Sequence, residues 1–129
     1  MKNNLINMLK EKEIKRQITD YLRLKGWKVY RLNNAGIYNP KSKSFFFRGE
    51  KGLADLLALK AGFPCWFIET KSLKGKVSKE QKEFQKLVLS SYNGWANVIH
   101  SLEEVMEIEK GMAEVFEKRL DNKAFNFIK

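Results

Sequence analysis

The chain has 129 residues, of which 43% are hydrophobic, so it is long enough to bury a core and too apolar to be disordered. It has no apolar run of about 18 residues that could span a membrane. Its single cysteine and single histidine exclude an intrachain disulfide and the zinc motifs built from several such residues. The net charge of +10 favours a polyanion as partner over a membrane, with a merely solvated basic surface as the alternative.

The first half of the chain predicts a helix followed by a strand. Apolar residues recur at helical spacing over 12–25 and a glycine follows, although the helix can begin as early as Asn4. Residues that favour strands then predict a strand over 27–32. Residues 37–51 are loop-like, and the aromatic run 45–47 within them is either a short strand or the wall of a groove.

The second half predicts two strands and then a return to helices. Two apolar strands, 53–59 and 65–71, are joined by a Gly-Phe-Pro turn, and Ser78 with Gln81 forms a capping box that begins a helix. The remaining expected elements are a basic loop over 72–76, a strand over 95–100, and helices over about 101–109 and 111–120. This order predicts an α/β fold with a mixed central sheet flanked by helices.

The two apolar strands place like charges opposite each other. If the turn is centred on Gly62, paired residues have numbers that add up to 124, so Asp55 lies opposite Glu69. Directly opposed carboxylates repel each other. Lys71 lies two residues beyond Glu69 and therefore points to the same face. A bound divalent cation is the simplest explanation for this arrangement.

These residues carry a resemblance to a known family. Gly52-x-x-Asp55, followed after thirteen residues by Glu69-x-Lys71, resembles the core of the PD-(D/E)XK nucleases. More narrowly, the chain resembles the stand-alone VRR-NUC (virus-type replication-repair nuclease) domain of phages and bacteria. The segments that support this are Lys-Gly-Trp-Lys-Val-Tyr-Arg-Leu-Asn (25–33), Gly-Leu-Ala-Asp-Leu-Leu-Ala-Leu (52–59) and Phe-Ile-Glu-Thr-Lys-Ser-Leu-Lys-Gly-Lys-Val-Ser-Lys-Glu-Gln (67–81).

The resemblance covers residues from about 10 to 105. It implies one restriction-endonuclease-like domain over 1–129, in which 111–129 form a C-terminal extension. The chain departs from the family pattern at two positions beside the site: Ala54 replaces the usual proline, and Thr70 stands where valine or alanine is common. Neither change removes a functional group.

The resemblance implies a metal-dependent active site. Asp55 and Glu69 would be the metal-binding carboxylates and Lys71 the catalytic lysine. Hard carboxylate oxygens suit Mg²⁺, and we expect Mn²⁺ to substitute for it. The alternatives are that Asp55 is a solvated turn residue and that Glu69 and Lys71 form a surface ion pair.

Two further residues are less distinct. The family's helical glutamate, also a metal ligand, corresponds best to Glu13, which lies beside Ile14 at the margin of the apolar stripe; Glu11 and Glu13 are both alternatively solvent-facing charges. The family's glutamine corresponds to Gln81, for which the capping box is an equally good explanation. Candidate DNA contacts, or else solvated charges, are Arg31, Lys51, Lys74 and Lys76.

The resemblance therefore predicts a Mg²⁺-dependent DNA endonuclease that acts on branched DNA such as Holliday junctions. It also implies a homodimer in the cytoplasm of a bacterium or a phage-infected cell. The apolar segment 112–128 is the candidate dimer contact, and packing on its own domain is the alternative. A non-catalytic nucleic-acid-binding module and a basic protein-interaction adaptor are the rival functions.

Overall fold

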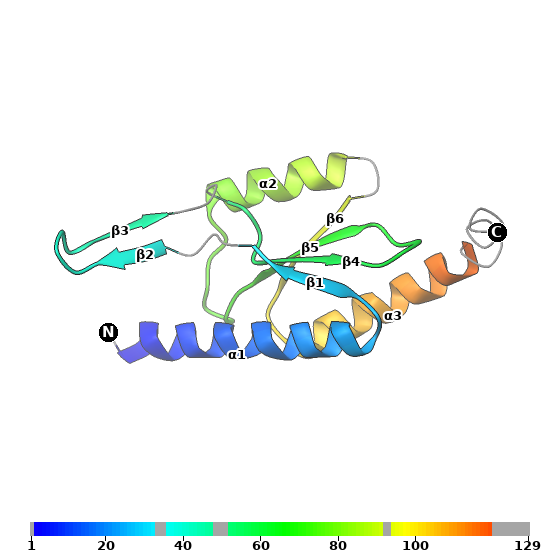
Figure 1. Cartoon of the computed structure of the whole chain (residues 1–129), viewed down its shortest axis with the longest axis horizontal. Helices are drawn as coiled ribbons and strands as arrows, with labels where there is room; N and C mark the ends of the chain where they lie inside the picture. Colours follow the sequence, from blue (N-terminus) through cyan, green and yellow to red (C-terminus); the bar gives the residue numbers. More distant parts are fainter. Residues whose placement is uncertain (1, 33–35, 48–51, 92–93, 120–129) are drawn as a thin grey trace.

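A four-stranded sheet with helices on both faces forms the body of the molecule (Figure 1). The computed structural model describes residues 2–32, 36–47, 52–91 and 94–119. In chain order the elements are α1 (Lys2–Leu24), β1 (Lys28–Arg31), β2 (Gly36–Asn39), β3 (Ser44–Phe47), β4 (Leu56–Leu59), β5 (Cys65–Thr70), α2 (Lys79–Ser90), β6 (Gly94–Ile99) and α3 (Leu102–Arg119). The predicted α/β class with a mixed sheet is confirmed.

The sheet has the strand order β1-β4-β5-β6. β4 pairs antiparallel with β1 and β5, while β6 pairs parallel with β5, because α2 connects those two strands as a crossover. The helices α1 and α3 lie on one face of the sheet and α2 lies on the other (Figure 1). The core between them is apolar, and its largest fully buried side chain is Trp66, which meets Trp27 edge to face.

The hairpin of β4 and β5 has the predicted register. The paired residues include Leu56 with Ile68 and Ala58 with Trp66, so the sum of 124 holds along the ladder. The turn is made at Gly62, whose φ of +83° is costly for other residues. Asp55 and Glu69 follow directly after the last pair, Leu56 with Ile68, at the end of the sheet away from the turn.

Three elements differ from the sequence-based expectation. Residues 36–39, expected as loop, form β2 and pair with the aromatic run in β3, and Figure 1 shows this second sheet projecting from the body. The helix α3 continues through Gly111, where a break was expected, because the apolar spacing is the same on both sides of that glycine. α1 begins at Lys2, earlier than its strongest apolar pattern.

The last turns of α3 pack on their own domain. Met112 is buried in the core, and the ring of Phe116 lies against those of Phe63 and Trp95. Met112 and Phe116 of the candidate dimer segment therefore pack within their own chain. Residues 120–128 of that segment lie outside the described part of the chain. No helix in the described ranges has the length and apolarity needed to cross a membrane.

Candidate active site

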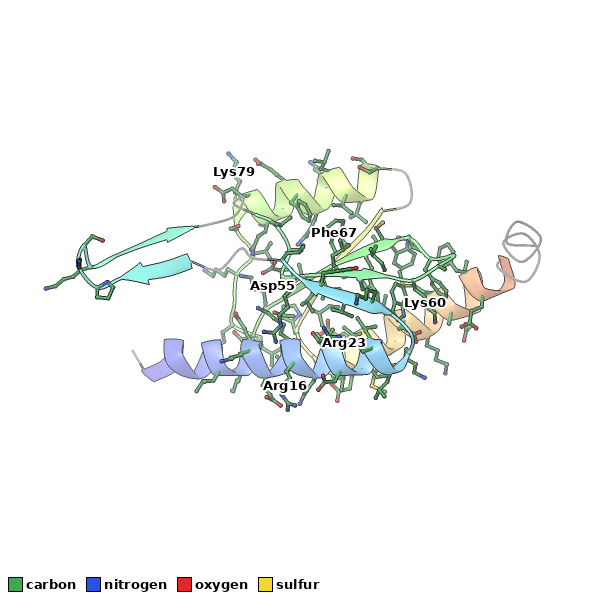
Figure 2. The ribbon with its side chains drawn as sticks, viewed as in Figure 1. Arg16, Arg23, Asp55, Lys60, Phe67 and Lys79 are labelled. Carbon is green, nitrogen blue, oxygen red and sulfur yellow. The ribbon has the colours of Figure 1, made fainter. Side chains whose placement is uncertain are left out.

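Asp55 stands at the entrance to β4, between α1 and α2 (Figure 2). Its backbone carbonyl accepts a hydrogen bond from the Leu32 amide at 2.8 Å, which fixes it to the end of β1. Its Oδ2 accepts two hydrogen bonds from Thr70, one from the amide at 2.9 Å and one from the hydroxyl at 2.8 Å. Oδ2 is thereby held in one orientation, and Oδ1 points toward other partners.

Glu69 lies next to Asp55 near the end of β5 and is only 5% exposed. Its Oε1 accepts a hydrogen bond from Gln81 Nε2 at 2.9 Å and lies 3.7 Å from Lys71 Nζ. Its Oε2 is buried and receives no hydrogen bond from the described residues. The structure therefore brings Asp55, Glu69 and Lys71 together, as the hairpin register predicted.

The environment of Glu69 favours its neutral form. Burial, followed by the negative charge of Asp55, raises the pKa of Glu69 from 4.5 to about 8, against the opposing effects of Lys71 and Lys15. A buried carboxyl group beside a second one is costly to ionise unless a cation joins them. A cation close to Asp55 and Glu69 would therefore lower the free-energy cost of ionising both carboxyl groups.

Gln81 combines the two functions that the sequence left open. Its backbone amide donates to Ser78 Oγ at 3.1 Å and its side-chain oxygen accepts from the Ser78 amide at 2.9 Å, which completes the capping box of α2. Its side-chain amide nitrogen is left to donate to Glu69. The cap therefore aims the remaining donor of Gln81 at the site.

Glu13 does not face the site. It is 51% exposed on its side chain and forms an ion pair with Arg16. Figure 2 shows Arg16 on the side of α1 away from the sheet. The hydrogen bonding from Arg16 lowers the pKa of the Glu13 carboxyl group. Glu11 faces the site instead: its Oε1 accepts from the Ser72 amide at 3.1 Å. Of the two helical glutamates, the structure therefore brings Glu11, and not Glu13, to the start of the loop that follows β5.

Gly75 lies against this glutamate and the lysine of the motif. A Cβ built on Gly75 would come within 3.2 Å of Glu11 Oε1 and 3.3 Å of Lys71 Cδ. The loop after β5 thus passes close to both side chains, and its glycine makes room for them. Glu11 supports the start of that loop through the Ser72 amide.

Two site residues, Lys15 and Thr70, were not among the sequence-based candidates. Lys15 Nζ lies 3.5 Å from Asp55 Oδ1, and its position four residues after Glu11 puts both on one face of α1. The spacing of Glu11 and Lys15 from the buried Ile18 is the signal that could have found them. Thr70 was noted only as a departure from the family pattern.

Three of the four candidate DNA contacts lie within the described residues. Arg31, Lys74 and Lys76 are exposed, on β1 and on the loop after β5, and are free to meet a polyanion. Lys51 lies outside the described residues. Their contact with DNA remains a prediction.

The carboxyl groups fit a magnesium ion that keeps most of its water. Within the described ranges, no group of three or more aspartate, glutamate, histidine or cysteine side chains is arranged to hold a metal. Mg²⁺ is commonly held by one or two carboxylates together with water and substrate phosphate, so two carboxylates suffice. Asp55 Oδ1 and the unpartnered Glu69 Oε2 are the oxygens that would hold it.

Comparison with known proteins supports the fold. No protein-family model matches the chain, and no curated protein is similar enough to count as a relative. A solved structure described as "VRR_NUC domain" is similar, with a TM-score of 0.60 and 19% sequence identity over 78% of this chain and 95% of that chain. This chain has the fold of the VRR_NUC domain.

Proposed function

We propose that this chain is a Mg²⁺-dependent endonuclease that hydrolyses DNA phosphodiester bonds. The observation that carries the proposal is the meeting of Asp55 and Glu69 with Lys71 at one end of the sheet. The solved structure that shares the fold bears the name of the nuclease domain that the sequence resembles. The net charge of +10 suits a nucleic-acid substrate.

The residues divide the chemical work among them. When bound, the metal neutralises charge on the phosphate and lowers the pKa of a water molecule. Asp55 and Glu69 would hold that ion, while hydrogen bonds from Thr70 and Gln81 fix the orientation of the two carboxyl groups. Lys71, 19% exposed on its side chain, either orients the attacking water or stabilises negative charge on the phosphate.

The preferred substrate under this proposal is branched DNA such as a Holliday junction. Symmetric cleavage of a four-way junction needs two active sites, so the active species would be a homodimer. Both features follow from the sequence resemblance. Light scattering coupled to size exclusion tests the dimer, and a mass of one chain at assay concentration would contradict it.

The catalytic proposal is tested by cleavage of labelled DNA. Four-way junctions and linear duplexes are incubated with Mg²⁺ or Mn²⁺ and wild type, Asp55→Asn or Lys71→Met. We expect metal-dependent nicks, a preference for the junction, and a loss of at least about a hundred-fold in both variants. Lys12→Met, which removes an exposed lysine of α1, is the control for charge.

The outcomes separate the rival functions. Cleavage that survives Asp55→Asn would show that the reaction occurs elsewhere. DNA binding by wild type without cleavage, with either metal, would favour the non-catalytic binding module on the same fold. Equal cleavage of junction and linear duplex would contradict the proposed substrate preference but not the proposed nuclease activity.

A further inference from the structure

Lys15 brings a second ammonium group to the two carboxyl groups of the site. It extends from α1 with its Nζ 3.5 Å from Asp55 Oδ1, and its side chain is 28% exposed. Its positive charge also acts on Glu69. Together with Lys71, which lies by Glu69, it gives each carboxyl group one ammonium neighbour.

The helix holds Lys15 in this position. The next turn of α1 contains Ile18 and Thr19, both buried against the sheet. The Thr19 hydroxyl donates to the Lys15 carbonyl at 2.8 Å, on the same buried side. Lys12 provides the contrast, since it is exposed and has no ion pair with any described residue.

Lys15 occupies the side of Asp55 that a metal ion needs. Asp55 Oδ2 already accepts two hydrogen bonds from Thr70, so Oδ1 is the oxygen with lone pairs to give. Lys15 is the cation beside Oδ1 in this structure. A divalent ion that binds Oδ1 meets a like charge at close range, which costs free energy unless the ammonium moves away.

We propose that Lys15 is a built-in counter-ion that competes with the divalent cation for Asp55 and thereby sets the metal affinity of the DNA-free protein. This inference rests on the proposed function, because it concerns the metal that the nuclease would use. Without metal, Lys15 neutralises Asp55. With metal, its ammonium moves off Oδ1 and is available to a phosphate of bound DNA.

Manganese binding by the full chain, without DNA, tests this role. Free Mn²⁺ is measured by electron paramagnetic resonance for wild type, Lys15→Met, Lys15→Arg and Lys12→Met. We expect Lys15→Met to bind Mn²⁺ about ten-fold more tightly, because the competing charge is gone. Lys15→Arg should stay near wild type, and Lys12→Met should change the affinity by less than about two-fold. Lys15→Gln is the second neutral variant, should Lys15→Met fail to fold.

Two results would overturn the role of Lys15. One is unchanged or weaker Mn²⁺ binding by the neutral Lys15 variants, and the other is an equal gain in Lys12→Met, which would reflect net charge alone. If wild type still binds Mn²⁺ and loses it in Asp55→Asn, the proposed function stands without this inference. If wild type and Lys15→Met bind no Mn²⁺, both fail together.

Discussion

Thr70 holds Asp55 through two hydrogen bonds to the same carboxylate oxygen. The backbone amide and the hydroxyl of Thr70 both donate to Asp55 Oδ2, at 2.9 and 2.8 Å. Thr70 is itself 2% exposed, so its hydroxyl has little access to solvent. A position at which this sequence departs from the pattern of the family it resembles therefore supplies a contact that orients the carboxylate proposed to hold the metal.

Replacing Thr70 by valine should weaken both stability and cleavage. Valine keeps the shape and the backbone donor but removes the hydroxyl, and a hydrogen bond to a charged group contributes about 1.5–3 kcal/mol. We expect the free energy of unfolding to fall by about 1.5–3 kcal/mol and the cleavage rate to fall by about ten-fold. Urea unfolding and single-turnover cleavage measure the two effects.

Thr70→Ser is the matched control, because it keeps the hydroxyl. It should retain most of the cleavage rate even if it loses some packing. Equal cleavage rates in the valine and serine variants would show that the hydroxyl does not orient Asp55 for the reaction.

The hairpin geometry could be predicted from sequence because it is local. A turn centred on Gly62 fixes every pairing along β4 and β5, and with it the approach of Asp55 and Glu69. The choice between Glu11 and Glu13 depends instead on how α1 is rotated against the sheet. That rotation follows from which apolar residues are buried. Because Glu11 and Glu13 are two residues apart in the helix, their side chains point in nearly opposite directions around its axis.

The turn of the second hairpin is marked only weakly in the sequence, by Asn39-Pro40. Its connecting residues include Lys43, which adopts a φ of +52° without being glycine, and lysine is not a residue that usually marks such a turn. The side-chain pairing of Gln81 with Glu69 was equally hidden, because the capping box alone accounts for a glutamine at that position. The contact between Gln81 and Glu69 depends on tertiary structure, which a local pattern does not contain.

In the metal-free protein, Glu69 should make stability fall as pH rises. Its pKa is raised from 4.5 to about 8 in the folded state, so the native protein binds this proton more tightly than the unfolded chain. The stabilising effect is complete below the unfolded pKa and is lost as pH rises through the folded one. Between pH 5 and 8 we expect a loss of about 3 kcal/mol.

Urea unfolding in EDTA at several pH values measures this slope. Glu69→Gln, which cannot ionise, should flatten it, whereas titration of the exposed Glu13 affects wild type and variant alike. Added Mn²⁺ should reduce the slope in wild type, because the metal favours the ionised carboxyl group. Parallel pH profiles for wild type and Glu69→Gln in EDTA would contradict the raised pKa.

Glu11 should matter for cleavage and Glu13 should not. Glu11→Ala removes the acceptor for the Ser72 amide beside Lys71, so we expect cleavage to fall by about ten-fold or more. Glu13→Ala removes an exposed ion pair and should change the rate by less than about two-fold. Alanine favours helix in both cases, so the variants are matched. A larger loss of cleavage rate in Glu13→Ala than in Glu11→Ala would favour Glu13 as the helical glutamate of the site, as the sequence resemblance suggested.

Two glycine-to-alanine substitutions should have opposite effects. Gly52, three residues before Asp55, has a φ of +88°, and a Cβ there would collide with the Glu80 carbonyl oxygen of α2. We expect Gly52→Ala to reduce the free energy of unfolding by at least about 2 kcal/mol and to slow cleavage, because the segment that leads to Asp55 must shift. Gly111 lies inside α3 with nothing within 4 Å of its Cβ position, so Gly111→Ala should stabilise by about 0.5–1 kcal/mol.

Thermal and urea unfolding of both variants, together with single-turnover cleavage, check this pair. Gly111→Ala should leave the cleavage rate unchanged, since nothing lies within 4 Å of the Gly111 Cβ position and α3 packs on the core. A Gly52→Ala protein as stable and as active as wild type would mean that the close approach of the Asp55 loop to α2 is not required. That result would also remove the steric reason for a glycine at the start of the motif.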